Sequence, residues 1–377
     1  MKNSEKIFFD GDHYFKELLE EIDLAKESIT VEMYMFNPDS IGRIIANKLI
    51  QAQNRGVRVQ LIVDGVGSYH FHKTLETELK NHKIQVKIYH PLPFYHPYYG
   101  PLRWWRKFGI LLSRILRINT RNHRKLITID QKVLFAGSFN FTEEHTDFMK
   151  ERKWKDMGMR ITGSVVPFAV LNFKKIWNFK EYFRYKKQIK KTTRIHWKTS
   201  PLRLNNTLFM KRFFYKDFLH RINQAENQIW FMTPYFIPKR RLIKALGKAA
   251  ERGVDIKLLI SRKTDVSFFN WLPFFYFPFL VKRGVNIFLY KESVLHAKNY
   301  IIDDFITIGS TNLNHRSFLH DLEFDLQVQD LENKALVKQH FLETLHGQIQ
   351  VNQDYLNKRS LKDRLISRIL FTFKYWF

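Results

Sequence analysis

The chain contains no cysteine among its 377 residues, which excludes disulfide bonds and thiolate metal sites. Long apolar runs are also missing. A membrane-spanning helix needs roughly 20 apolar residues, and the nearest candidate, residues 268–281, is interrupted by Asn270, Pro273 and Pro278. The first 12 residues are polar and lack the apolar core of a secretory signal. We therefore expect a cytoplasmic protein, without a signal peptide or a transmembrane helix.

Acidic residues are scarce relative to basic ones. Asp and Glu total 36 against 63 Lys and Arg, a formal net charge of +27. Such an excess suits a polyanionic partner, either nucleic acid or an anionic membrane surface. Aromatic residues make up 16% of the chain, with 35 Phe and 8 Trp. This bulky apolar content favours a lipid interface.

One motif occurs twice in the sequence, with the pattern H-x-K-x4-D followed by Gly-Ser-x-Asn. The first copy comprises His123, Lys125, Asp130, Ser138 and Asn140, and the second comprises His296, Lys298, Asp303, Ser310 and Asn312. Two imidazoles, two ammonium groups and two amides could therefore meet at one pocket between similar halves. We expect Ser138, Asn140, Ser310 and Asn312 to bind phosphate.

Each motif copy is expected to form a β-hairpin. The apolar runs 126–129 and 299–302 follow the motif lysines, and the runs 133–136 and 305–308 lead back. A histidine and a lysine two positions apart project from the same face of a strand. The returning strand brings Gly-Ser-x-Asn beside them, so each hairpin assembles half of a site.

These residue types suit displacement at a phosphodiester. Lysine and asparagine donors can stabilise charge on the nonbridging oxygens. A neutral histidine can attack phosphorus and form a phosphohistidine, while a protonated histidine gives its proton to the departing alkoxide. Protein cations take the place of a metal, so we expect no metal and no cofactor.

Four acids are candidates for supporting roles. Asp156 and Glu323 each precede an apolar strand downstream of a motif histidine, and we expect them to fix the tautomers of the imidazoles. Asp130 and Asp303 complete the catalytic motif, but each stands where a strand meets a turn, a position at which Asp commonly caps. We expect these two to support strand geometry.

The order strand, helix, strand is repeated in the two halves. Residues 29–36, 41–55 and 57–64 show this pattern, and residues 229–236, 239–252 and 254–261 repeat it. Gly56 and Gly253 stand where the two helices should stop. The sequence thus predicts an α/β fold of two duplicated lobes, residues 1–190 and 191–377.

Several further segments resemble the phospholipase D superfamily, and within it the bacterial cardiolipin synthases. They are Asp39-x-x-Gly42, Arg55-Gly56-Val57, Asn122-His-Arg-Lys125, Thr233-Pro-Tyr-Phe-x-Pro238 and Asn312-Leu-x-x-Arg316. The resemblance implies a pseudo-twofold fold with the active site at the lobe junction. It also implies a reaction in which one phosphatidylglycerol transfers its phosphatidyl group to another and glycerol is released. By this resemblance His123 is the nucleophile and His296 the acid and base.

The sequence departs from the family pattern at three places. Asn314 stands where the family usually has Asp, and the turn between Asp303 and Gly309 is one residue shorter than that between Asp130 and Gly137. The amino-terminal membrane hairpin of the commonest members is not seen. These departures leave the donor and acceptor lipids open more than the chemistry.

An amphipathic insertion, residues 101–119, precedes His123. On a helix its apolar side carries Trp104, Trp105, Phe108, Leu111 and Leu112, with basic residues mostly opposite. We expect it to dock on the membrane, although internal packing is the alternative. The aromatic segment 268–281 fills the same interval in the second half, so both would flank one mouth of the site. The basic amphipathic tail, residues 361–377, has a similar character.

Phosphatidylglycerol and the cytoplasmic face of the cell membrane are therefore the expected partners, through peripheral contact. The alternative is a phosphodiesterase that acts on nucleic acid or hydrolyses phospholipid, since the same half-sites serve nucleases of this superfamily. A non-enzymatic membrane adaptor would need both motifs to be vestigial. The histidines at positions 70, 72, 90 and 96 match no zinc-ligand spacing.

Overall fold

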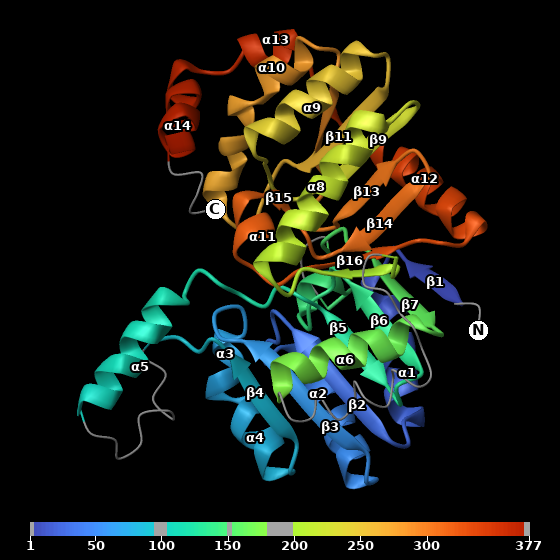
Figure 1. Cartoon of the computed structure of the whole chain (residues 1–377), viewed down its shortest axis with the longest axis vertical. Coiled ribbons are helices and arrows are strands. Elements are labelled where there is room, and N and C mark those ends of the chain that lie inside the picture. The colour runs from blue at the N-terminus through green and yellow to red at the C-terminus, as the bar shows by residue number, and fades with distance from the viewer. Residues whose placement is uncertain (1–3, 94–103, 149–152, 179–198, 373–377) are drawn as a thin grey trace.

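The computed structural model describes residues 4–93, 104–148, 153–178 and 199–372 (Figure 1). Two β-sheets form the centres of two lobes. The first half of the chain, coloured blue to green, builds the lower lobe in Figure 1, and the second half, coloured yellow to red, builds the upper one. The predicted pair of α/β lobes is confirmed. The expected boundary at residues 190 and 191 lies outside the described residues.

The first sheet has seven strands. Their order is β1 (Glu5–Phe8), β7 (Gly158–Thr162), β6 (Val133–Gly137), β5 (Leu126–Ile129), β2 (Ser28–Met33), β3 (Arg58–Asp64) and β4 (Gln85–Tyr89). Strands β2, β3 and β4 are parallel, while β5, β6, β7 and β1 pair antiparallel. The motif hairpin predicted from the apolar runs is thus the β5 and β6 pair.

The second sheet repeats the first and adds one edge strand. Its order is β17 (Ile349–Val351), β12 (Asn286–Tyr290), β11 (Asp255–Ser261), β9 (Gln228–Thr233), β13 (Asn299–Ile302), β14 (Phe305–Gly309), β16 (Phe324–Gln327) and β8 (Leu202–Leu204). Strands β9, β11 and β12 are parallel, and β13 and β14 form the second motif hairpin. The duplication therefore extends from the motif to the whole sheet.

Helices cover the outer face of each sheet. Helices α1 (Gly11–Leu24), α2 (Ser40–Asn54) and α4 (Leu75–Asn81) close one core of the first lobe. Helices α8 (Leu208–Gln224), α9 (Arg240–Glu251) and α10 (Phe277–Val281) do so in the second. Gly56 and Gly253 end α2 and α9 at φ of 92° and 91°, a conformation that favours glycine.

A third apolar core joins the two lobes. Leu134 and Met159 of the first sheet and Met232 and Ile301 of the second are fully buried in it. Helices α6 (Val165–Trp177) and α12 (Leu331–Leu345) complete this core. Because both sheets are apolar on two faces, the lobes pack firmly against each other and hold the junction in a fixed geometry.

The aromatic segment 268–281 packs largely inside the second lobe. It forms the short helices η3 (Ser267–Asn270), η4 (Leu272–Phe275) and α10, and Phe269, Leu272, Phe277 and Leu280 are buried in the second lobe. The tail helix α14 (Leu361–Thr372) packs onto it, and Phe275 stacks on Phe371 at 3.5 Å between ring centroids. Most of the segment thus fills a core while Phe275 is 41% exposed, and a position at the mouth of the site stays a prediction.

The amphipathic insertion forms helix α5 (Trp104–Leu116), which projects to the left of the first lobe in Figure 1. Leu112 and Ile115 are 47% and 49% exposed, and Leu111 is half-buried. Arg114 is buried and donates to the carbonyl oxygen of Leu92 at 3.2 Å. The side chains of Trp104, Trp105 and Phe108 lie outside the described residues.

Among the described residues, none of the helices has both the length and the apolar composition required to cross a lipid bilayer.

Candidate active site

The two motif histidines lie where backbone segments of the two lobes run side by side. The amide of His123 donates to the carbonyl oxygen of Leu322 at 3.0 Å, and the amide of His296 donates to that of Lys155 at 2.8 Å. Each histidine is therefore held against the strand segment that carries the other lobe's supporting acid.

Each motif histidine is contacted by the supporting acid of the opposite lobe. Nδ1 of His123 lies 3.0 Å from Oε2 of Glu323, and Nδ1 of His296 lies 2.6 Å from Oδ2 of Asp156. In each pair we assign a proton to Nδ1, which donates it in a hydrogen bond to the carboxylate. The neutral rings then present an unprotonated Nε2, the form that a nucleophile or a general base needs. Asp156 and Glu323 thus take the orienting positions that the sequence predicts.

The two motif serines hold these acids. Ser138 Oγ donates to Asp156, and Ser310 Oγ donates to Oε2 of Glu323 at 2.5 Å. Ser317 Oγ adds a third contact, to Oε1 of Glu323 at 2.7 Å. The prediction that Ser138 and Ser310 bind phosphate is therefore wrong in this geometry. Each serine directly follows β6 or β14, and the acid stands just before the neighbouring strand, so the hydroxyl is already engaged.

The glycines before these serines permit the close approach. A Cβ atom on Gly137 would lie 2.6 Å from Cα of Gly158 on the neighbouring strand, and one on Gly309 would clash with the carbonyl oxygen of Phe324. Only glycine lets the strands pair here without displacement. The Gly-Ser pair of each motif is thus the element that fixes the acid.

The motif lysines and Asn140 carry side-chain donors suited to an anion, whereas the buried atom of Asn312 without a partner among the described residues is Oδ1, an acceptor. Lys125 Nζ lies 2.6 Å from the carbonyl oxygen of His123, and Lys298 Nζ lies 2.5 Å from that of His296. Asn140 accepts from the Met35 amide at 3.3 Å, and its Nδ2 is a buried donor without a partner among the described residues. These fixed donors surround the histidines, as phosphoryl transfer requires.

Burial and positive charge keep the imidazoles neutral. Burial lowers the pKa of both His123 and His296 well below the ordinary value, and Lys125 and Lys298 lower it further. Burial also raises the pKa of Glu323 to about 7. A phosphodiester anion placed between the lysines would offset their charge and favour protonation of one imidazole. Binding of the anion would therefore supply the protonated imidazole that acts as the general acid.

The motif aspartates lie at the far end of the hairpins. Asp130 accepts the backbone amides of Lys26, Glu27 and Ser28 at 2.9, 2.7 and 3.0 Å. Asp303 accepts the equivalent amides of residues 226–228 at 2.9 to 3.0 Å. Both residues have positive φ, 49° and 48°. They tie the turns to the starts of β2 and β9 and have no hydrogen bond to either histidine, which is the supporting position that the sequence predicts.

One buried histidine escaped the sequence prediction. Nε2 of His145 accepts from the Asn140 amide at 3.2 Å, and its Nδ1 lies 3.2 Å from Oδ2 of Asp156. Burial lowers the pKa of His145 to about 3. In the second lobe Ser317 Oγ accepts from the Asn312 amide at 3.2 Å. His145 and Ser317 both stand five residues after the motif asparagine, and this shared spacing is the signal that could have revealed them.

A metal site is the alternative interpretation of the cluster formed by His145, Asp156 and His296. Ligand atoms of His145, Asp156 and His296 lie within 4.8 Å of one another. However, Nε2 of His145 accepts from a backbone amide and Nδ1 of His296 lies against the carboxylate. A cation would have to displace these hydrogen bonds. The residues therefore fit a proton network better than a metal centre.

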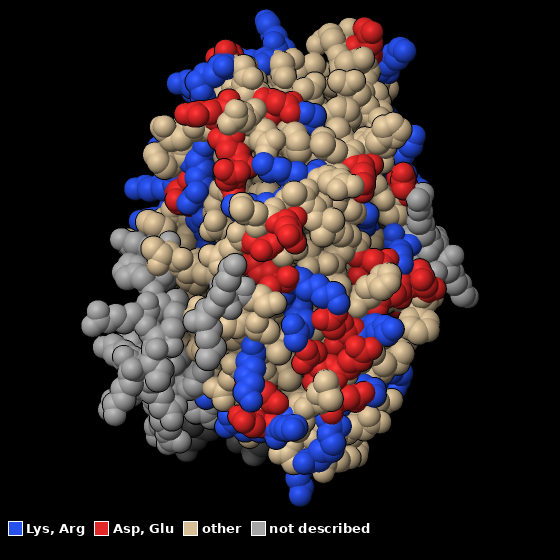
Figure 2. Space-filling model, turned by 90° about the vertical axis from the view of Figure 1, so that its right-hand side faces the viewer, with Lys and Arg blue, Asp and Glu red and all other residues tan. Residues whose placement is uncertain are grey.

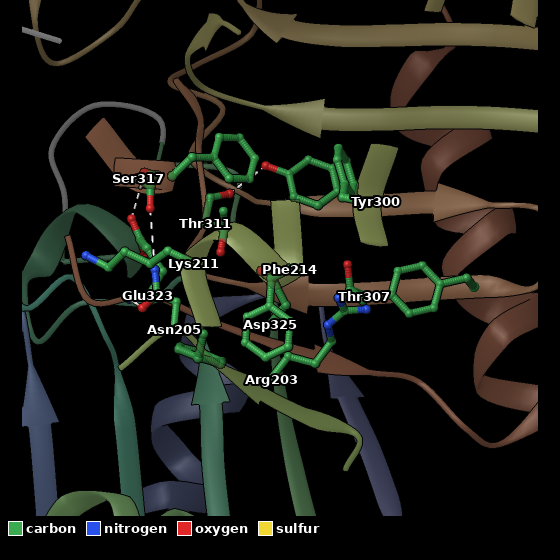
Figure 3. Close-up of a pocket in the computed structure, with 14 residues that line it drawn as sticks. Arg203, Asn205, Lys211, Phe214, Tyr300, Thr307, Thr311, Ser317, Glu323 and Asp325 are labelled. Atoms are coloured by element: carbon green, nitrogen blue, oxygen red, sulfur yellow. Dashed lines mark hydrogen bonds between the residues drawn. The ribbon is translucent and has the colours of Figure 1, made fainter. Parts of the chain in front are cut away.

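A small cavity next to Glu323 is shown in Figure 3. Its volume is about 30 Å³, room for about one water. Arg203 and Asp325 line it, while Ser317 and Asn205 hold Glu323 in place. The cavity is too small for a substrate and belongs to the packing that supports the acid.

The two local departures leave this geometry intact. Asn314 caps helix α11 (His315–Leu319) and accepts from the Ser317 amide at 2.9 Å, a role that Asn fills as well as Asp. In the shorter turn, Asp303 still accepts three backbone amides. Both departures are therefore compatible with a working site.

Comparisons with known proteins agree with this site. The profile of a family described as "Cardiolipin synthase, PLD-like domain" matches residues 18–162 and 218–345. A cardiolipin synthase of Clostridium perfringens is 28% identical over 379 residues, covering 98% of this chain and 76% of the relative. Cardiolipin synthase 2 of Bacillus cereus is 30% identical over 370 residues, covering 94% and 67%.

Solved structures show the same fold. The phosphatidylserine synthase of Haemophilus influenzae superposes with a TM-score of 0.67 at 13% identity, covering 98% of this chain and 92% of that one. A polyphosphate kinase of Porphyromonas gingivalis gives 0.61 at 13% identity, covering 99% and 53%. With the duplicated motif at the lobe junction and the family profile matched in both halves, the chain belongs to the phospholipase D superfamily, in the cardiolipin synthase family.

Proposed function

We propose that this enzyme is a phosphatidyltransferase that makes cardiolipin from two molecules of phosphatidylglycerol and releases glycerol. One observation carries the proposal: two imidazoles, each oriented by an acid from the opposite lobe, lie with two buried lysines at the lobe junction. Nucleophilic displacement at a phosphodiester, with a second group to move the proton, needs this arrangement.

In the first step His123 is the nucleophile. Its Nε2 attacks the phosphorus of phosphatidylglycerol and a P–N bond forms as the P–O bond to glycerol breaks. His296, protonated when the anion binds, gives its proton to the departing glycerol oxygen. Glu323 stabilises the charge that develops on His123, because its carboxylate lies 3.0 Å from Nδ1.

In the second step a hydroxyl of another phosphatidylglycerol attacks the phosphohistidine. His296, now neutral, accepts the hydroxyl proton, and the P–N bond breaks as the new P–O bond forms. Lys125, Lys298 and Asn140 stabilise the nonbridging oxygens in both steps. The sum is two phosphatidylglycerol molecules converted to one cardiolipin and one glycerol.

Peripheral docking at the cytoplasmic face of the membrane would bring these lipids to the site. Leu361, Leu365 and Ile369 form an exposed stripe on α14, at 82%, 59% and 52% exposure. Leu112 and Ile115 of α5 are also exposed, and both helices lie on the left side in Figure 1. Apolar stripes beside basic residues are typical of interfacial helices.

The test is incubation of the purified protein with phosphatidylglycerol vesicles in the presence of a chelator. Cardiolipin and glycerol should appear in equal amounts, and His123→Ala or His296→Ala should abolish both products. Phosphatidic acid without cardiolipin would instead indicate a phospholipase D that transfers to water. Nicking of DNA without lipid turnover would reject the proposal in favour of a nuclease.

A further inference from the structure

A strongly basic groove lies on the second lobe, between α8, the start of α9 and α11. Its volume is about 520 Å³. Six basic side chains line it, three from α8 and three from the start of α9: Lys211, Arg212, Lys216, Lys239, Arg240 and Arg241. Tyr215, Tyr276 and Phe318 supply an aromatic wall. The groove thus combines high positive charge with apolar surface.

Asp321 and Glu323 partly balance the charge of Lys211, but neither acid lines the groove. The groove has no Asp or Glu in its lining, and none of the six basic side chains forms an ion pair with a described residue. The acid of α8, Asp217, pairs with Arg203 and Arg221 instead. Six like charges held together without an ion pair to a described residue repel one another, so the groove is prepared for an anion.

The face shown in Figure 2 differs from the groove in that it carries both acidic and basic side chains. Red and blue side chains alternate over it, and the elements at this side carry paired charges. Lys6 pairs with Glu17, and Arg160 pairs with Glu21. The ion pairs on this face contrast with the six basic side chains of the groove, which form no ion pair with a described residue.

One polar group of the aromatic wall also lacks a hydrogen-bond partner among the described residues. The hydroxyl of Tyr215 is buried and unpartnered among the described residues. Lys239 Nζ lies 4.7 Å above the Tyr215 ring, and its pKa is lowered by burial and by the neighbouring Arg241 and Arg212. Helix α9 has no acid in its first turn, where the helix dipole favours one. An anion in the groove would relieve the repulsion and complement the dipole.

The groove and the catalytic acid Glu323 lie on either side of α11, although Lys211 and Phe318 line both the groove and the small cavity beside Glu323. Ser317 of α11 contacts Glu323, whereas the next two residues, Phe318 and Leu319, line the groove. Lys211 ties α8 to the end of α11, with Nζ 2.6 Å from the carbonyl oxygen of His320. The motif histidines do not line the groove.

We propose that this groove binds the phosphodiester headgroup of an anionic phospholipid, at a second lipid site apart from the catalytic histidines. The membrane setting rests on the proposed function. The aromatic wall favours a lipid over free phosphate, and so do Leu208 and Phe209, which are 67% and 66% exposed at the start of α8, just before Lys211. The cations would hold the phosphate while the apolar surface meets the acyl chains.

The test compares two charge-reversal variants in the His123→Ala protein, which the proposed mechanism leaves unable to turn the lipid over. Lys216→Glu/Arg241→Glu alters the groove. Lys244→Glu/Lys248→Glu makes the same net charge change at exposed positions of α9 outside it. Binding of a water-soluble, short-chain phosphatidylglycerol is measured by calorimetry, and circular dichroism checks the fold of each variant.

The parent protein should bind two equivalents of lipid. The groove variant should lose one equivalent, with affinity at that site reduced at least about tenfold, while the control variant stays within about twofold of the parent. One equivalent in all three proteins, or equal losses in both variants, would overturn the proposal. Groove-dependent binding of inorganic phosphate as tight as that of the lipid would make it a small-anion site.

Two further outcomes separate the proposals. A groove variant that loses affinity for a DNA duplex and keeps both lipid equivalents would reject the lipid assignment in favour of nucleic acid. Cardiolipin synthesis is measured separately, on the protein with an intact His123. If that protein made no cardiolipin while lipid binding still depended on the groove, the proposed function would fail and the second lipid site would stand.

Discussion

Oδ2 of Asp156, in the first lobe, lies 2.6 Å from Nδ1 of His296 in the second. The reciprocal pair, Glu323 and His123, is 3.0 Å apart. Neither lobe can therefore orient its own histidine, and the catalytic geometry exists only when the lobes are packed together. The shared apolar core that joins the sheets fixes this geometry.

Replacing an orienting acid should remove activity while leaving the fold intact. Asp156→Asn and Glu323→Gln keep the shape but favour the wrong imidazole tautomer, so we expect kcat to fall by about 10² to 10⁴. The measurement is cardiolipin formation at saturating lipid. Asp304→Asn, at an exposed side chain in the β13–β14 turn, is the control and should be neutral. Equal activity in all these variants would contradict the cross-lobe assignment.

The two histidines should differ when the leaving group needs no proton. In a phosphatidyl ester of p-nitrophenol, the leaving group departs as the stable p-nitrophenolate anion. His296→Ala should therefore still release one equivalent of it in a burst. His123→Ala should release none, because the nucleophile is missing. Stopped-flow absorbance measures both. A burst from His123→Ala and none from His296→Ala would exchange the two roles.

His145 should act as a positioning residue for His296 through Asp156. We expect His145→Ala to lower kcat for phosphatidylglycerol by about 10- to 100-fold, since small misplacements of catalytic groups have effects of this size. The burst with the p-nitrophenyl ester should change little, because that step bypasses the acid. A variant that loses both reactions equally would show a merely structural role.

Activity should decline on the alkaline side of neutrality. Burial lowers the pKa of Lys298 to about 8, so the free enzyme loses this cation as the pH rises through that value. Because the cation holds the phosphate, kcat/KM should fall there. Lys298→Arg stays charged, so the alkaline limb of its profile of kcat/KM against pH should move to higher pH. We expect its activity at pH 7 to be lower than that of the parent. An unchanged alkaline limb in this variant would assign the titration to another group.

The exposed stripe of α14 should contribute to membrane binding. Leu365→Glu/Ile369→Glu removes apolar contact and adds negative charge, so we expect binding to phosphatidylglycerol vesicles to weaken at least about tenfold. The matched control is Leu331→Glu/Leu336→Glu on α12, also exposed and on the right side of Figure 1. Vesicle sedimentation measures both, and equal losses would mean that the effect is only one of charge.

Sequence reasoning reached the local elements because their signals are local. The strand pairs of the motif hairpins, the helices that end at Gly56 and Gly253 and the supporting position of Asp130 follow from spacing within a few residues. The duplicated motif also identified the family. The same reasoning placed Ser138 and Ser310 on the substrate, because composition shows only that a hydroxyl is available.

The amino-acid sequence alone determined the two half-sites and the chemistry that they can perform. Tertiary structure alone decided that Asp156 serves a histidine 140 positions away and Glu323 one 200 positions away. It also brought His145 beside His296, buried much of the aromatic segment and gathered the cations of the groove. The physical reason is that these contacts depend on how two sheets pack, which no local periodicity encodes.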